Sequence, residues 1–105
     1  MTTDMPSLDP DARPTLGRLL AVVRGRVQGV GFRYATVREA RRLRLTGYVL
    51  NAADGAVEVV AEGATEDLAS LLAWLEHGPP GAAVYDVEHR SVPYRGEFRR
   101  FTVEY

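Results

Sequence analysis

The pattern of hydrophobic and polar residues along this chain is typical of strands in some segments and of helices in others. Residues 18–24 contain a short run, residues 19–23, that is apolar on both faces, which is typical of a central strand. In residues 57–62, by contrast, the apolar residues Val57, Val59 and Ala61 alternate with positions that include Glu58 and Glu62. This is the period of a strand with one buried face. Residues 48–51, 84–91 and 101–105 complete the set of predicted strands.

Two other segments show the spacing of amphipathic helices. Residues 33–44 carry a narrow apolar stripe among charged side chains, suited to lying on a sheet. The clearer stripe consists of leucines at i, i+3, i+4 and i+7, namely Leu68, Leu71, Leu72 and Leu75. Thr65 is expected to cap this second helix at its N-terminus, and the run of glycine and prolines at 78–80 to end it.

The order of these segments predicts an α+β fold, the ferredoxin-like βαββαβ sandwich with a short extra C-terminal strand. In such a sandwich two helices cover one face of an antiparallel sheet. A right-handed crossover makes the first two strands parallel, with the third strand between them. The segment after residue 24 and Asn51 should therefore leave the sheet at one edge, about 10 Å apart by two strand spacings.

Length and composition indicate one domain with an N-terminal extension. The chain has 105 residues with 46% hydrophobic content, enough for a single small core. We expect residues 1–17, rich in proline and aspartate, to form a disordered tail, and residues 18–105 to form the domain. The tail lacks the basic start and apolar run of a signal peptide, and no later segment approaches the roughly 18 apolar residues of a membrane span. A cytoplasmic monomer without membrane contact is expected.

The residue types that are missing exclude several chemistries. The chain has no cysteine, which excludes disulfides, a thiolate nucleophile and a cysteine-ligated metal. All thirteen basic residues are arginine, so neither a lysine Schiff base nor the phosphate-gripping lysine of a P-loop is available. We expect neither a metal nor a cofactor.

Charge is distributed unevenly along the sequence. Residues 24–44 hold seven arginines against the single acid Glu39, whereas residues 51–90 hold eight acids against Arg90 alone. One side of the first helix should therefore be electropositive and steer small anions inward. Four of these arginines are interpreted as a solvated helix face: Arg38, Arg41, Arg42 and Arg44.

The stretch GRVQGVGFR, residues 25–33, has the composition of an anion-binding loop. Its glycines permit positive φ and leave no side chain in the way, so successive backbone N–H groups can line a concave surface. A helix N-terminus adds unpaired N–H donors and partial positive charge. Arg33 at that end should cost about 0.3 to 1 kcal/mol unless an anion is bound beside it.

Asn51 and Arg33 each have a purely structural interpretation as well as a functional one. Taken alone, Asn51 is a turn-initiating asparagine that bonds nearby backbone, and Arg33 is a surface arginine on a helix. Beside an anion pocket, however, a carboxamide can orient a water molecule without ionising. The planar guanidinium likewise offers bidentate donors that match a phosphoryl group.

The two motifs together resemble those of the acylphosphatases, small enzymes that hydrolyse carboxyl-phosphate mixed anhydrides. The loop fits the family pattern G-x-V-Q-G-V-x-F-R, and GYVLNAADGAVEVVAEG, residues 47–63, fits its second signature with Asn51, Gly55, Val57 and Gly63 in place. With the order of strands and helices, the resemblance covers residues 18–105. Leu50 departs from it, because relatives mostly carry a basic or polar residue there.

The resemblance implies a role for each site residue. Arg33 would be the phosphate-binding arginine and Asn51 the residue that positions the attacking water, these two being the catalytic pair. The substrate, a small acyl phosphate, would be held by the loop, that is by Gln28, Gly29, Val30, Gly31, Phe32 and Arg33. The family also suggests that the C-terminal carboxylate, here on Tyr105, lies near the arginine.

Other functions are weighed against the same residues. An RNA-recognition module of this fold stacks bases on aromatics of its third strand, but residues 57–62 offer none and carry two carboxylates, so we expect no nucleic-acid partner. Tyr48, Tyr85, Phe98 and Phe101 are interpreted as packing residues, and His77 and His89 as structural. A non-catalytic anion-binding module remains the main alternative.

Overall fold

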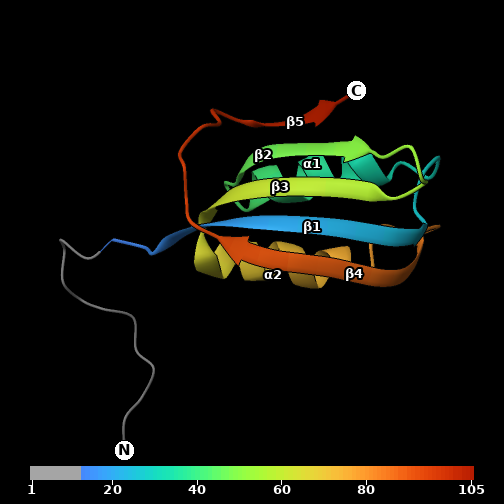
Figure 1. Ribbon diagram of the computed structural model, residues 1–105, viewed down its shortest axis with the longest axis horizontal. Coiled ribbons are helices and arrows are strands. Elements are labelled where there is room, and N and C mark those ends of the chain that lie inside the picture. The colour runs from blue at the N-terminus through green and yellow to red at the C-terminus, as the bar shows by residue number, and fades with distance from the viewer. Residues whose placement is uncertain (1–12) are drawn as a thin grey trace, which may run out of the picture.

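The computed structural model describes residues 13–105, in which a five-stranded sheet carries two helices on one face (Figure 1). Residues 1–12 of the predicted tail lie outside this range. The predicted boundary after residue 17 is wrong, because Leu16 and Gly17 already belong to the first strand, where they pair with Ala64 and Gly63. The elements in chain order are β1 (Leu16–Arg26), α1 (Phe32–Arg42), β2 (Thr46–Asn51), β3 (Val57–Ala64), α2 (Thr65–Leu75), β4 (Ala83–Val92) and β5 (Phe101–Glu104). Neither described helix is long and apolar enough to cross a membrane.

The sheet confirms the predicted ferredoxin-like order. Its strands lie in the sequence β4-β1-β3-β2-β5, and β3 pairs antiparallel with both β1 and β2. Val57 of β3 lies opposite Val23 on one side and opposite Asn51 on the other. β1 and β2 are therefore parallel and end at the same edge of the sheet, as predicted. β5 pairs parallel with β2, which makes the sheet mixed.

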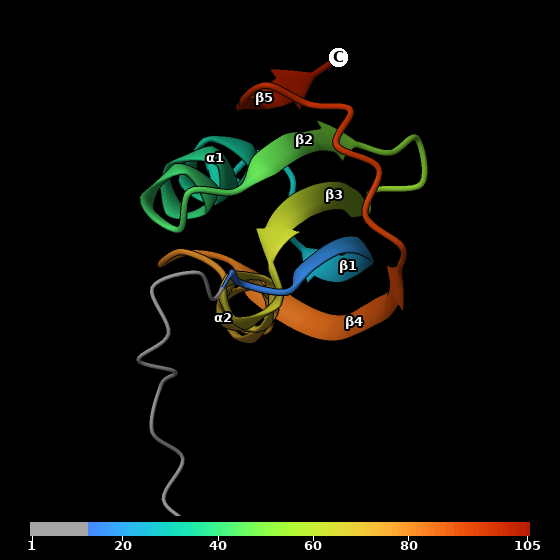
Figure 2. The same cartoon turned by 90° about the vertical axis from the view of Figure 1, so that its left-hand side faces the viewer.

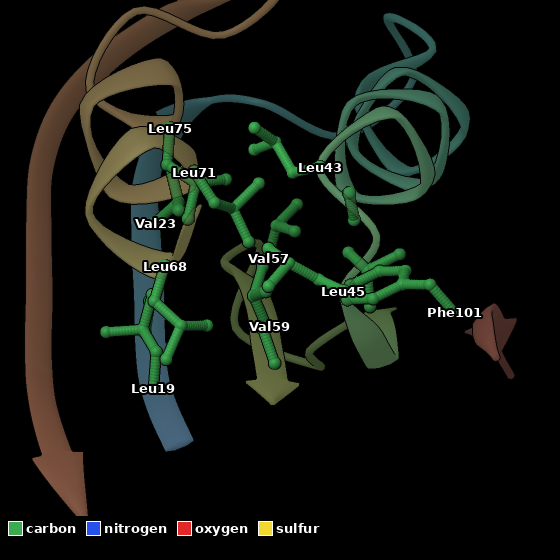
Figure 3. Close-up of a cluster of buried hydrophobic side chains, with 14 of the residues drawn as sticks. Leu19, Val23, Leu43, Leu45, Val57, Val59, Leu68, Leu71, Leu75 and Phe101 are labelled. Carbon is green, nitrogen blue, oxygen red and sulfur yellow. The ribbon is translucent and has the colours of Figure 1, made fainter. Parts of the chain in front are cut away.

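The core lies between the sheet and the two helices, which cover the same face (Figure 2). The leucine stripe of α2 is confirmed, since its Leu68, Leu71 and Leu75 are buried. Phe101 of β5 is fully buried as well, so the last strand is anchored in the same core. Figure 3 shows side chains of this cluster, among them Leu19, Val23, Leu45, Val57, Val59 and Phe101.

The predicted N-cap of α2 is wrong. Ala64, in an extended conformation, occupies the cap position and makes no side-chain capping hydrogen bond. Thr65 is already helical, and its N–H donates to the carbonyl oxygen of Thr15 at 2.9 Å. Because β3 runs directly into α2, the acceptor comes from Thr15, the residue just before β1, which pairs with β3. A sequence pattern does not reveal this acceptor.

The first helix ends earlier than predicted, at an arginine in the left-handed conformation. Arg44 has φ of 60°, and Leu45 N–H donates to the Ala40 carbonyl at 2.9 Å, as in a glycine-terminated helix. A side chain at such a position is strained. Arg44→Gly is therefore expected to raise the free energy of unfolding by about 0.5 to 1 kcal/mol, measured by urea denaturation. Arg44→Val should lower it, and a Gly variant no more stable than the wild type would contradict the assignment of strain.

A buried carboxylate ties the β4–β5 connection to the helix-free face of the sheet. The Glu62 side chain is fully buried and accepts backbone N–H bonds from Arg95 at 2.7 Å, Gly96 at 3.2 Å and Glu97 at 3.1 Å. The guanidinium of Arg18 donates to the same carboxylate at 3.3 Å. Arg18 also pairs with the Glu97 side chain, and the Phe98 ring lies 5.3 Å from its guanidinium carbon.

This network predicts an acid-sensitive contribution to stability. Burial alone would raise the pKa of Glu62, but the hydrogen bonds from Arg95, Glu97 and Arg18 outweigh it and hold the pKa below its ordinary value. A depressed pKa contributes stability above the unfolded value near 4.5, and this contribution is lost as pH falls through the folded value. Glu62→Gln should lower the free energy of unfolding by about 2 kcal/mol at pH 7.

Urea denaturation at several pH values tests this contribution. The difference between Glu62→Gln and the wild type should shrink as pH falls below about 4.5, where the carboxylate of the unfolded chain begins to protonate, and should vanish below the lower pKa of the folded protein. Glu58→Gln is the matched control, since Glu58 lies on the same strand without the amide contacts. A difference that is independent of pH would show that the charge of Glu62 is not what holds the connection.

Candidate active site

The glycine loop bends through two left-handed residues immediately before α1. Gly29 has φ of 78° and Gly31, the N-cap of α1, has φ of 76°. A Cβ at either glycine would meet nothing within 4 Å, so the backbone angle and not crowding requires glycine there, and the space before the loop is open. The first helical bond joins Ala35 N–H to the Gly31 carbonyl at 3.0 Å. The preceding N–H groups of the first turn have no earlier helical carbonyl to bond.

Phe32 fixes the point at which the loop becomes a helix. Its ring is buried, lies 5.7 Å from the Trp74 ring of α2, and packs against Gly78 just after that helix. A Cβ at Gly78 would come within 2.5 Å of the Phe32 ring, and its φ of 69° also favours glycine. The C-terminal end of α2 thus supports the N-terminal end of α1.

Gln28 joins the glycine loop to the turn between β2 and β3. Its side-chain nitrogen donates to the carbonyl oxygens of Ala52 at 2.8 Å and Ala56 at 2.9 Å. The sequence did not reveal this brace, because it depends on two segments that only the sheet brings together. Both N–H donors of the Gln28 side chain are used within the protein. Only its backbone N–H would therefore be free for the predicted part in anion binding.

Asn51 is the last residue of β2, and its side-chain oxygen has no partner. The Oδ1 atom is buried and accepts no hydrogen bond from any residue in the range 13–105. The turn that follows is held without it, by Ala52 N–H to the Ala56 carbonyl at 2.8 Å and by Ala56 N–H to Asp54 Oδ1 at 3.0 Å. The interpretation of Asn51 as a residue that bonds nearby backbone through this oxygen is therefore wrong. A buried amide oxygen without a partner is costly, and it marks a place where water or a ligand belongs.

Arg33 is half-buried in the first turn of α1, which contains no acidic residue. Its guanidinium carbon lies 5.2 Å from the centre of the Tyr105 ring. Among residues 13–105 it makes no ion pair within 4.0 Å, so it forms none with the carboxylate of Tyr105. The C-terminal residue is close to the arginine, but it contacts it with the ring.

Several other sequence interpretations can be checked against the structure. Arg41 is exposed, but instead of only facing solvent it donates through Nε and Nη2 to the Phe101 carbonyl at 3.2 and 3.0 Å. Tyr85 is 75% exposed and does not pack in the core, unlike Val84 and Val87 of the same strand β4. Tyr48 and Phe98 do pack together, with ring centres 5.7 Å apart.

Leu50, the departure from the family pattern, lies on the other face of the sheet from Asn51. Successive residues of a strand point to opposite faces. Leu50 pairs with Glu58 on one side and Glu104 on the other, on the helix-free face. Its side chain is therefore directed away from the glycine loop.

Several known proteins that are similar to this chain in sequence or in fold are acylphosphatases. The acylphosphatase family model matches residues 19–103. An acylphosphatase of Burkholderia lata is 51% identical over 79 residues, covering 75% of this chain and 81% of the relative, and one of Burkholderia mallei is 56% identical over 72 residues, covering 66% and 74%. The crystal structure of the Bacillus subtilis acylphosphatase, 37% identical, superposes with a TM-score of 0.82 over 87% of this chain and all of that one.

Proposed function

Because this chain belongs to the acylphosphatase family, enzymes that hydrolyse acyl phosphates, we propose how its own residues perform that reaction. Arg33 and the backbone N–H groups of residues 28–33 bind the phosphoryl group, and Asn51 positions the attacking water. The observation that carries the proposal is the buried, unpartnered Oδ1 of Asn51 at the sheet edge where the glycine loop also begins.

Phosphoryl binding follows from the charge at the start of α1. The helix N-terminus, Arg33 and the left-handed loop all favour an anion, and the first turn holds no acid to neutralise them. The guanidinium can donate two parallel hydrogen bonds to phosphoryl oxygens, and the loop amides can bond the oxygen charge that develops in the transition state. The Gln28 brace keeps these donors in place before the substrate arrives.

Asn51 supplies geometry for the nucleophile without supplying a base. Its Oδ1 can accept a hydrogen bond from water and so aim the oxygen lone pair at phosphorus. The water attacks as the bond to the acyl oxygen breaks, and the carboxylate leaves with the bonding electrons. Neither Arg33 nor Asn51 can accept a proton near neutral pH, so the water proton passes to a phosphoryl oxygen of the substrate. The step needs no metal and forms no covalent intermediate.

Hydrolysis of benzoyl phosphate in excess EDTA tests the proposal most directly. We expect full activity with the chelator, release of benzoate and inorganic phosphate in equal amounts, and loss of turnover in Asn51→Ala. Phosphate binding without turnover in the wild type would instead indicate a non-catalytic anion-binding module. Activity that appears only on adding a divalent cation would overturn metal independence.

The pH profile tests the absence of a protein base. Since no side chain with a pKa near 7 takes part, kcat should be flat from about pH 5.5 to 8. His77 and His89 are both exposed, at the end of α2 and on β4. His77→Gln and His89→Gln should therefore leave the profile unchanged. A histidine-like limb that disappears in either variant would count against the proposed proton transfer.

The remaining expectations complete the proposal. The folded domain, in which β1 begins at Leu16, is the catalytic part of the chain, and the enzyme is a cytoplasmic monomer whose partner is its small-molecule substrate and not nucleic acid. Deleting residues 1–12 should leave kcat/KM for benzoyl phosphate unchanged. A large loss in the shortened chain would place part of the site in the tail.

A further inference from the structure

Two exposed tyrosines meet at the proposed phosphate-binding arginine. The Tyr105 ring lies over the Arg33 guanidinium, 5.2 Å from its carbon atom. The hydroxyl groups of Tyr105 and Tyr34 are 3.1 Å apart and share a hydrogen bond. Tyr105 is 90% exposed and Tyr34 61% exposed, so core packing does not hold these rings in place. Their contacts with each other and with Arg33 hold them instead.

The register of the last strand brings Tyr105 to this point. β5 runs parallel to β2 with Glu104 opposite Leu50, so Tyr105 follows β5 at the level where Asn51 follows Leu50. The other end of β5 is fixed by the buried Phe101, whose carbonyl accepts the fork of Arg41. Helix α1 therefore contacts β5 at both ends. Arg41, near the C-terminal end of the helix, bonds Phe101 at the start of β5, and Arg33 and Tyr34, in the first turn of the helix, contact Tyr105 just after β5.

An aromatic ring that lies over a guanidinium orients the guanidinium without using its N–H donors. The cation is attracted to the face of the ring, whereas all five N–H groups lie in the guanidinium plane and point outward from its edge. A carboxylate partner would occupy part of that edge and cancel the charge. With an aromatic partner, both the donors and the full charge remain for the phosphoryl group.

We propose that Tyr105 positions Arg33 through its aromatic ring, and that the Tyr34 hydroxyl holds this ring in place. The inference rests on the proposed role of Arg33 in binding the phosphoryl group. Tyr105 is a positioning residue, because it contacts the arginine and acts on the substrate only through it. Tyr105 thereby belongs to the site by virtue of its side chain.

Steady-state kinetics of substitutions at the two tyrosines test the ring. Tyr105→Leu should raise the KM for benzoyl phosphate and the inhibition constant of inorganic phosphate by about fivefold, with a smaller effect on kcat. Tyr105→Phe keeps the ring and loses only the hydroxyl bond, so it should cost about twofold, as should Tyr34→Phe. The double variant should be no worse than either, since both remove one shared bond. An unchanged phosphate inhibition constant in Tyr105→Leu would overturn the proposal.

Adding one glycine after Tyr105 separates the ring from the carboxylate. The ring keeps its place in this extended chain, but the terminal carboxylate moves by one residue. We expect KM and phosphate inhibition to stay within about twofold of the wild type. A loss as large as that of Tyr105→Leu would show that the carboxylate acts, and would overturn the proposal.

Coupling to Arg33 distinguishes positioning from a general structural effect. In an Arg33→Ala background, measured at high enzyme concentration, Tyr105→Leu should cause no further loss, whereas an equal further loss would overturn the proposal. Tyr85→Leu removes another exposed tyrosine, on β4, and should leave all constants unchanged. A wild type that neither hydrolyses benzoyl phosphate nor binds phosphate would refute the proposed function itself, whereas an active wild type with an indifferent Tyr105 refutes only this inference.

Discussion

Replacing Arg33 by lysine should lower kcat/KM for benzoyl phosphate by about a thousandfold, although the positive charge is kept. An ammonium group cannot reproduce the planar fork that bonds two phosphoryl oxygens at once. It also lacks the flat face that lies against Tyr105, 5.2 Å away in the structure, so it loses its orientation as well. The loss should appear both in affinity for inorganic phosphate and in kcat, because the charge on the oxygens grows towards the transition state.

Arg38→Lys is the matched control, since Arg38 is an exposed arginine on the same helix. It should retain wild-type kinetics, and circular dichroism should show both variants folded. Wild-type affinity for inorganic phosphate in Arg33→Lys would show that charge alone suffices and that the fork is not what matters.

Replacing Asn51 by alanine should reduce kcat by about a hundredfold and leave the KM almost unchanged. In the proposed mechanism, the water is aimed at phosphorus chiefly in the transition state, whereas the loop and Arg33 hold the phosphoryl group in the ground state. The substitution also removes a buried oxygen that has no partner among the described residues, so it should not destabilise the protein. Loss of rate without loss of stability separates a functional role from a structural one.

Leu50→Arg serves as the control beside Asn51. Leu50 precedes Asn51 on the strand but points to the opposite face, between Glu58 and Glu104. Its kcat should stay within about twofold of the wild type. Unchanged turnover in Asn51→Ala would remove Asn51 from the mechanism.

The fold could be predicted because its signals are local. Leucines at helical spacing, the alternation of β3 and the glycine loop each occur within a few residues of sequence, and the right-handed crossover then determines which strand ends meet. For this reason the sequence alone predicts that the glycine loop and Asn51 lie at one edge of the sheet. The family motifs assign the same two residues.

What could not be predicted depends on segments far apart in the chain. Alternation indicates that Glu62 faces away from the core, but not that the connection after β4 covers it and donates three N–H groups. The bond from Arg41 to Phe101 and the stacking of Tyr105 on Arg33 likewise depend on where β5 joins the sheet. Gln28 was assigned to the site by its position in the motif, and its bracing role needed the turn after Asn51 to be in place.

In the Glu62 network, residues 95–97 hold an internal anion with consecutive main-chain dipoles. The mechanism that we propose uses the main-chain dipoles of the glycine loop in the same way for an incoming anion. Because peptide groups do not titrate and carry no side-chain identity, the exposed side chain at 95 can change over evolutionary time without removing the N–H donor to Glu62. A change at 97 also keeps its N–H donor, but it removes the ion pair between Glu97 and Arg18. Drift of the surface at 95 is thereby decoupled from retention of the buried charge.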